Sequence, residues 1–175
     1  YSKLSHKKWP EFLPTMTKRG TLFFIEDFLA FGNARAVAKA LERLVNNGGI
    51  SRVARGIYAV LQTDPVLGNI QPSAEQIAEV IRKRDKARII PTGILALNAL
   101  GLSTQIPLNL VYLTDGSART VDLGKRKIKF KRTSPKNLAA IGEISGLVIQ
   151  ALKEIGKDNV TQQEKDLVIE KLKKE

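Results

Sequence analysis

The sequence predicts an α+β protein, in which an N-terminal winged helix-turn-helix precedes a small α/β domain with an antiparallel meander and C-terminal helices. Two short strand-like runs follow a capped helical segment over 34–47, which is the element order of a helix followed by a wing. Three further runs between 108 and 133 alternate polar and apolar residues, and two helical stretches close the chain. We expect domains over 1–62 and 73–175, joined by a turn-rich linker over 63–72.

The elements of the N-terminal domain follow from local signals. Because Pro10 and Pro14 interrupt a helix begun at Lys3, the extent of any helix before Gly20 is left open, and the start at Tyr1 suggests a processed or trimmed terminus. Asn33 is a good N-cap for the helix over 34–47, which Gly48-Gly49 ends. The other expected elements are a strand over Thr21–Ile25, a short helix over Glu26–Phe31, and strands over Ile50–Val53 and Ile57–Leu61 around the turn at 54–56.

The C-terminal domain begins with two predicted helices. Ser73 caps the first, which runs to Lys86, and Pro91 opens the second, which ends before Gly101. The strands of the meander are expected over Leu108–Thr114, Ala118–Leu123 and Arg126–Thr133, and the closing helices over 143–155 and 161–173.

Composition restricts the partners and the chemistry. The 175 residues carry 29 Lys or Arg and 17 Asp or Glu, and the excess of +12 divides as +6 over 1–62, +6 over 63–133 and zero over 134–175. This balance favours nucleic acid, an anionic membrane surface or an acidic protein as partner. The chain has no Cys and one His, so we expect no metal site and no cofactor. No apolar run is long enough to span a membrane, so we expect a cytoplasmic protein without a membrane partner.

The helix over 34–47 has an apolar side and a basic side at 100° per residue. The apolar side carries Val37, Leu41, Leu44 and Val45, and the opposite side carries Arg35, Lys39, Arg43 and Asn46. Arg can bind guanine, Asn can bind adenine, and Lys can neutralise phosphate, so this side predicts contact with double-stranded DNA. The alternative is an ordinary solvated helix face. Arg52, Arg55 and Gly56 in the hairpin favour DNA, because they give the wing the same charge; Tyr58 is equally a phosphate donor or a core residue.

A row of lysines alternates with apolar residues near residue 128. Lys125, Lys127, Lys129 and Lys131 lie on one face of the predicted strand, and Ile128 and Phe130 lie on the other. Successive lysines are about 6.6 Å apart, which is close to the phosphate spacing of a nucleic-acid strand. The row therefore predicts either phosphate contact or protection of an exposed sheet edge against aggregation.

Two further function classes remain as alternatives to a DNA-binding protein. A metal-dependent nuclease would use Asp115 and Asp122 with the nearby Lys125, but a turn and pairing with lysines explain both carboxylates sufficiently. Without a nucleophile–base pair or a phosphate-binding loop, we expect no enzymatic activity. The third class is a protein-binding antitoxin or scaffold whose positive charge meets an acidic partner.

Several blocks of sequence resemble the AbiEi-type regulators of bacterial type IV toxin-antitoxin systems, in their short-form relatives. The resemblance covers about residues 18–160 and is carried by FFIEDFLAFGNARAVAKALERLVNNGGISRVARGIYAV, RDKARIIPTGILALNALGLSTQIP, VYLTDG and KFKRTSPKNLA. It implies a winged helix that binds operator DNA, with Arg35, Lys39, Arg43, Arg52 and Arg55 as contacts, and a C-terminal antitoxin domain. It also implies autorepression and a nucleotidyltransferase-like toxin that is countered without a stable complex. We expect a monomer or weak dimer.

Overall fold

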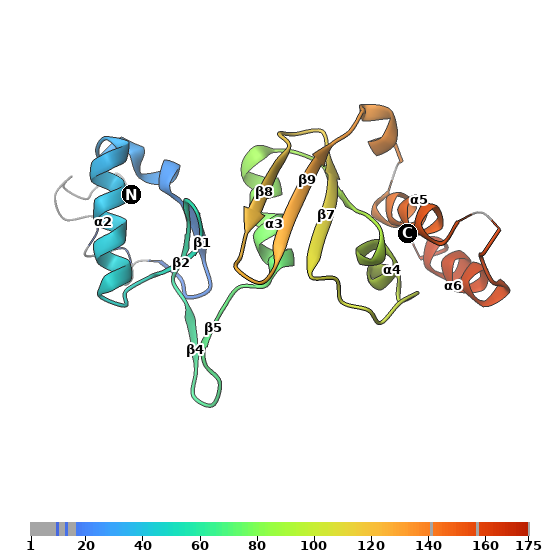
Figure 1. Ribbon diagram of the computed structural model, residues 1–175, viewed down its shortest axis with the longest axis horizontal. Helices are drawn as coiled ribbons and strands as arrows, with labels where there is room; N and C mark the ends of the chain where they lie inside the picture. The colour runs from blue at the N-terminus through green and yellow to red at the C-terminus, as the bar shows by residue number, and fades with distance from the viewer. Residues whose placement is uncertain (1–9, 11–12, 14–16, 141, 157, 175) are drawn as a thin grey trace. The chain divides into compact units, whose positions relative to one another are not determined.

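The computed structural model describes residues 10, 13, 17–140, 142–156 and 158–174 and has a mixed α+β fold (Figure 1). The chain divides into two compact units, Tyr1–Ile77 and Ala78–Glu175. The expected helix before Gly20 lies largely outside the described residues. Each unit has its own sheet and its own buried residues, so each is described by itself.

A three-stranded antiparallel sheet forms the first unit together with two helices. The strands are β1 (Leu22–Phe24), β2 (Ser51–Ala54) and β3 (Ile57–Ala59), in the spatial order β1-β3-β2. A 3-10 helix, η1 (Ile25–Phe31), and the α-helix α2 (Ala34–Asn46) connect β1 to β2. The expected strands and helices between residues 21 and 61 are thus confirmed, with bounds that differ by one or two residues.

Helix α2 begins and ends at the residues that its local sequence predicts. The Asn33 side chain accepts a hydrogen bond from the backbone N–H of Ala36 at 2.9 Å and so caps the first turn. At the other end, Gly48 has a φ of 71°, and the N–H of Gly49 donates to the carbonyl of Leu44. Both ends of α2 are therefore held by defined hydrogen bonds.

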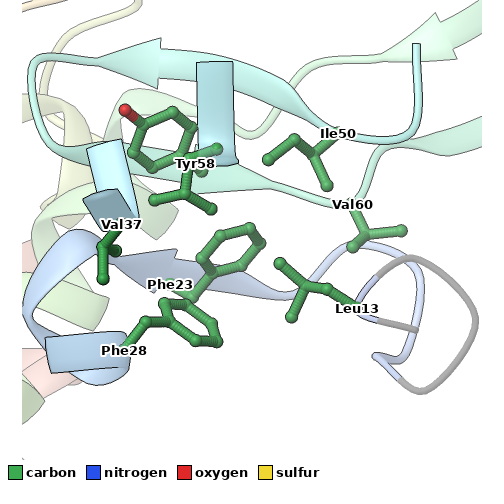
Figure 2. Packing of buried hydrophobic residues seen from close by; sticks show 8 residues of the cluster. Leu13, Phe23, Phe28, Val37, Ile50, Tyr58 and Val60 are labelled. Atoms are coloured by element: carbon green, nitrogen blue, oxygen red, sulfur yellow. The ribbon is translucent and has the colours of Figure 1, made fainter. Parts of the chain in front are cut away.

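The inner side of α2 packs into the core of the first unit, which Figure 2 shows from close by. Leu41 has no exposed surface, and the Phe23 ring stacks on the Tyr58 ring with centroids 5.9 Å apart. Phe28 meets Phe23 edge to face at 5.4 Å. The buried members of the cluster are Leu13, Phe23, Phe28, Val37, Leu41, Ile50, Tyr58 and Val60. This packing sets which side of α2 faces outward.

The segment expected as a linker over 63–72 contains a β-hairpin. Strands β4 (Gln62–Asp64) and β5 (Gly68–Ile70) pair antiparallel. The Asp64 carboxylate accepts backbone N–H bonds from Leu67 and Val66, at 2.9 and 2.8 Å, and these bonds lower the pKa of Asp64. The turn-forming residues that suggested a linker thus form the tip of this hairpin.

The second unit contains a four-stranded mixed sheet. Its strands are β6 (Ile89–Pro91), β7 (Asn109–Thr114), β8 (Arg119–Asp122) and β9 (Lys127–Arg132), in the order β6-β7-β9-β8. Strands β7 and β9 are parallel, and the other two pairs are antiparallel.

The expected antiparallel meander is wrong, because β9 lies between β7 and β8 instead of at the end of the sheet. In this place the backbone of β9 has a hydrogen-bonded neighbour on each side. Its apolar residues are also well covered, with Ile128 fully buried and Phe130 stacked on Tyr112 of β7 at 5.8 Å. Residue alternation predicts the two faces of a strand and leaves its neighbours undetermined, so the error concerns which strands pair and in which direction.

Helices flank the sheet of the second unit. The helices are α3 (Ala74–Asp85), α4 (Ile94–Leu100), the 3-10 helix η2 (Pro135–Leu138), α5 (Glu143–Ile155) and α6 (Gln162–Leu172). The prediction that Pro91 opens a helix is wrong: Pro91 ends β6, because β6 pairs with β7, and α4 begins after Gly93, whose φ is 59°. Helices α4, α5 and α6 share a core formed by Ala96, Leu100, Val148, Ala151 and Val168. Among the described residues, no helix has the length and apolarity needed to cross a membrane.

The cap of α2 can be tested by substitution. Asn33→Ala removes the acceptor for the Ala36 N–H, so we expect the free energy of unfolding to fall by about 1 kcal/mol. Asn46→Ala is the matched control, because the exposed Asn46 makes no side-chain hydrogen bond within the described chain, and its effect should stay within about 0.5 kcal/mol. Urea unfolding followed by far-ultraviolet circular dichroism measures both variants. Equal losses in the two would show that the cap contributes nothing specific.

Candidate functional site

The outward side of α2 carries the polar residues that its periodicity predicts. Arg35, Lys39, Arg43 and Asn46 are all exposed, whereas Val37 and Leu41 are buried against the sheet. The acidic Glu42 is exposed on the same side, so this side carries three positive charges and one negative charge. Because both ends of α2 are capped, these side chains project from a fixed helical backbone.

The β2–β3 hairpin adds two more exposed cations to the first unit. Arg52 lies opposite Tyr58 in the β2–β3 register, and its side chain therefore lies on the same face of the sheet as the ring that packs against α2. Arg55 is exposed in the turn between the two strands. We call the set formed by Arg35, Lys39, Arg43, Arg52 and Arg55 the α2–hairpin basic set.

Two other residues of the predicted DNA-contact group have structural roles. Gly56 supplies a φ of 76° at the hairpin turn, and its carbonyl accepts the N–H of Ile25 at 3.1 Å, so it shapes the backbone of the turn. The Tyr58 ring is 6% exposed and stacks on Phe23, so the core alternative holds for Tyr58. Its ring could not be assigned from sequence, because an aromatic residue in a two-stranded hairpin suits either face.

The α2–hairpin basic set differs from the other basic residues in its pairing. Within the described chain, none of its five members has an ion pair or a side-chain hydrogen bond. On α3, by contrast, Arg82 makes two hydrogen bonds to the Glu79 carboxylate, at 2.6 and 2.7 Å. Arg119 likewise pairs with Asp85. The unpaired set therefore offers its full charge to an external anion.

The lysine row lies on an interior strand. Lys127, Lys129 and Lys131 are exposed on one face of β9, and Lys125 lies in the turn before it. Since β9 has a neighbour on each side, the interpretation of the row as edge protection is wrong. Lys127 lies 3.6 Å from the carboxylate of Asp122 on β8. The remaining lysines of the strand, Lys129 and Lys131, have no ion pair with a described residue.

The two carboxylates of the nuclease alternative both accept hydrogen bonds from other residues of the second unit. Asp115 accepts hydrogen bonds from the backbone N–H and the Nε of Arg88, at 2.7 and 3.0 Å, and the backbone bond is the main cause of its lowered pKa. Asp122 accepts the N–H of Gly124 at 2.9 Å. In the described part of the chain, no group of three or more His, Cys, Asp or Glu could hold a metal ion.

Comparison of the sequence with known protein families gives a match. The profile of DUF6088, a family of unknown function, matches residues 12–175. The chain belongs to the DUF6088 family. No curated protein and no solved structure matches the sequence. The DUF6088 match spans both units, so the α2–hairpin basic set and the lysine row of β9 both lie within the family's region.

The role of Asp115 predicts a pH dependence of stability. Its folded pKa lies below its ordinary value of about 3.9, so Asp115 stabilises the folded protein above that pH and ceases to do so as the pH falls through the folded pKa. We expect Asp115→Asn, which keeps the acceptor oxygen and removes the charge, to be less stable than the natural protein at pH 7. The difference should shrink below about pH 4 in thermal unfolding measurements. A difference that is constant with pH would contradict the charge-based account.

Proposed function

We propose that the protein is a sequence-specific regulator that binds double-stranded DNA through its first unit, which acts as a winged helix-turn-helix. The observation that carries this proposal is the α2–hairpin basic set, which is exposed and has no carboxylate partner among the described residues. An α-helix fits the major groove of DNA, and a hairpin beside it can contact the backbone or the minor groove.

The order of elements in the first unit supports this proposal. A strand, a short helix, a second helix and a two-stranded hairpin follow one another, and β1 closes the sheet by pairing with β3. This pairing ties the hairpin to the strand that precedes both helices. The core then joins α2 to the same sheet through Val37, Leu41 and Tyr58. The helix and the hairpin therefore form one rigid body that can meet one partner.

The side chains on α2 suit both kinds of contact that sequence-specific binding needs. In the proposed complex, Arg35 and Arg43 donate to guanine or phosphate, and Asn46 can bind adenine through its amide. Lys39 neutralises a phosphate, as do Arg52 and Arg55 of the hairpin. Glu42 on the same side can accept from the amino group of cytosine and would disfavour a phosphate at its position.

The biological role that we propose comes from the resemblance to AbiEi-type regulators. The protein would repress its own operon and serve as the antitoxin of a nucleotidyltransferase-like toxin in the cytoplasm, without a stable complex with that toxin. The second unit would carry the antitoxin activity. Its sheet bears the lysine row of β9. Because β9 is an interior strand, these lysines do not protect a sheet edge.

DNA binding can be tested by fluorescence anisotropy with a duplex from upstream of the gene and a duplex of random sequence. If four or five phosphates are neutralised, the affinity should fall with salt at a log–log slope of about −4, because each contact releases condensed counterions. Mg²⁺-dependent cleavage of the duplex would favour the nuclease alternative. Absence of binding at low salt would refute the proposal.

Substitutions then separate base contacts from backbone contacts. Arg35→Ala or Arg43→Ala should cost about 1 to 3 kcal/mol on the preferred duplex and less on random DNA, if either side chain contacts a base. Arg55→Ala should weaken both duplexes alike and reduce the salt slope by about 1. Lys165→Ala is the matched control, since it removes one exposed charge from helix α6, and it should change neither value. Circular dichroism confirms that each variant is folded.

Repression and toxin neutralisation should be separable. We expect the double variant Arg35→Ala, Arg43→Ala to lose repression of a reporter under the protein's own promoter, because it removes two groove-facing charges. The same variant should still neutralise growth arrest by a nucleotidyltransferase-like toxin from the same operon. Loss of both activities in a folded variant at unchanged protein level would contradict the assignment of the antitoxin activity to the second unit.

A further inference from the structure

A cleft of about 370 Å³ opens in the second unit, between the lysine-bearing face of the sheet and helices α4 and α5. Thr92 and the start of α4 form one part of its lining, and Val111 of β7 lies on the sheet side. Lys131 of β9 also lines it, so the last lysine of the row belongs to this cleft. The volume falls in the range of clefts that hold small molecules.

Three polar side chains on α5 line the same cleft: Gln150, Lys153 and Glu154. Residues three and four positions apart share one face of a helix, so this part of α5 presents all three to the cleft. Within the described residues, Lys131, Lys153 and Glu154 have no ion pair. The cleft thus combines two unpaired ammonium groups with one unpaired carboxylate.

Gln150 is the most informative residue of the cleft. It is 6% exposed, and its buried Nε2 has no hydrogen-bond partner among the described residues. A buried amide donor loses its bonds to water, so native proteins almost always give it an acceptor. Because Nε2 is shielded in its present position, the amide has to turn toward the cleft before an acceptor group of a ligand there can supply the missing bond.

We infer that this cleft binds a small molecule that carries a phosphate monoester. Lys131 and Lys153 offer two positive charges, and the Gln150 amide can add a donor once it turns toward the cleft; together they suit a phosphate group with a charge of about −1.5 to −2. The Glu154 carboxylate accepts hydrogen bonds from hydroxyl groups of the same ligand. Because Glu154 leaves the three charged side chains of the cleft with a net charge of +1, a single ester of sugar or nucleoside fits this cleft better than a polyanion.

This site does not depend on the proposed DNA binding, because all its residues belong to the second unit. The full chain is titrated at constant ionic strength with ribose 5-phosphate and adenosine monophosphate, and with ribose and adenosine as neutral counterparts. Calorimetry and nuclear magnetic resonance provide the readouts. We expect saturable binding of at least one phosphate ester, no binding of the neutral compounds, and a shift of the Gln150 side-chain N–H resonances.

Variants test whether the named groups make the site. Lys131→Gln and Lys153→Gln should each weaken binding about tenfold, because each removes a charge-assisted contact. Gln150→Leu should weaken it as well while the protein stays folded, since it removes a buried donor and keeps the volume. Lys129→Gln is the matched control: it lies two residues from Lys131 on the same face of β9 and does not line the cleft, so affinity should be unchanged.

Three results would overturn the inference. The first is that no phosphate ester binds saturably, and the second is that Lys129→Gln weakens binding as much as Lys131→Gln. The third is that a 5′-phosphorylated oligonucleotide binds in a Lys131- and Lys153-dependent manner while the mononucleotide does not. That third outcome would assign the cleft to the end of a nucleic-acid strand instead of to a small molecule.

Discussion

The packing of α2 on the Phe23–Tyr58 face of the first sheet is the interaction on which the candidate interface depends. Val37 and Leu41 bury one side of the helix in this core, and burial of apolar surface is the main term that holds a helix in one orientation. The opposite side then has to face outward. The outward direction of the basic residues is therefore a consequence of apolar packing, and no polar contact among the described residues is needed to hold them there.

The pairing of charges separates structural cations from available ones. Around the end of α3, basic residues bind carboxylates: Arg82 binds Glu79, Arg88 binds Asp115, and Arg119 binds Asp85. The α2–hairpin basic set has no such partners within the described residues. Surface ion pairs add little to stability, so their main effect here is to neutralise the positive charge around α3, while the charge of the α2–hairpin basic set is not neutralised. This distribution is what concentrates positive potential on the first unit's helix and hairpin.

In the second unit, the position of β9 between β7 and β8 determines which basic side chains face outward, as the packing of α2 does in the first unit. It buries Ile128 and Phe130 on one face and lays three lysines across the other. The lysine face is then bordered by α4 and α5, which brings Lys131 into a cleft with Gln150 and Lys153. At the edge of the sheet, the row would be explained as protection against aggregation through strand pairing. Inside the sheet that explanation is absent, and the charges of Lys129 and Lys131 are available for a ligand.

Local signals in the sequence alone determined the bounds of α2, its two faces and the hairpin that follows, because caps, glycine turns and helical periodicity act within a few residues. The alternation of lysines along β9 was determined in the same way. Only the tertiary structure decided the order of the strands, the burial of Tyr58 and the cleft around Gln150. These features depend on contacts between residues far apart in the chain. Several strand and helix faces are similarly apolar and could pack against one another, and local sequence patterns do not specify which of them pair.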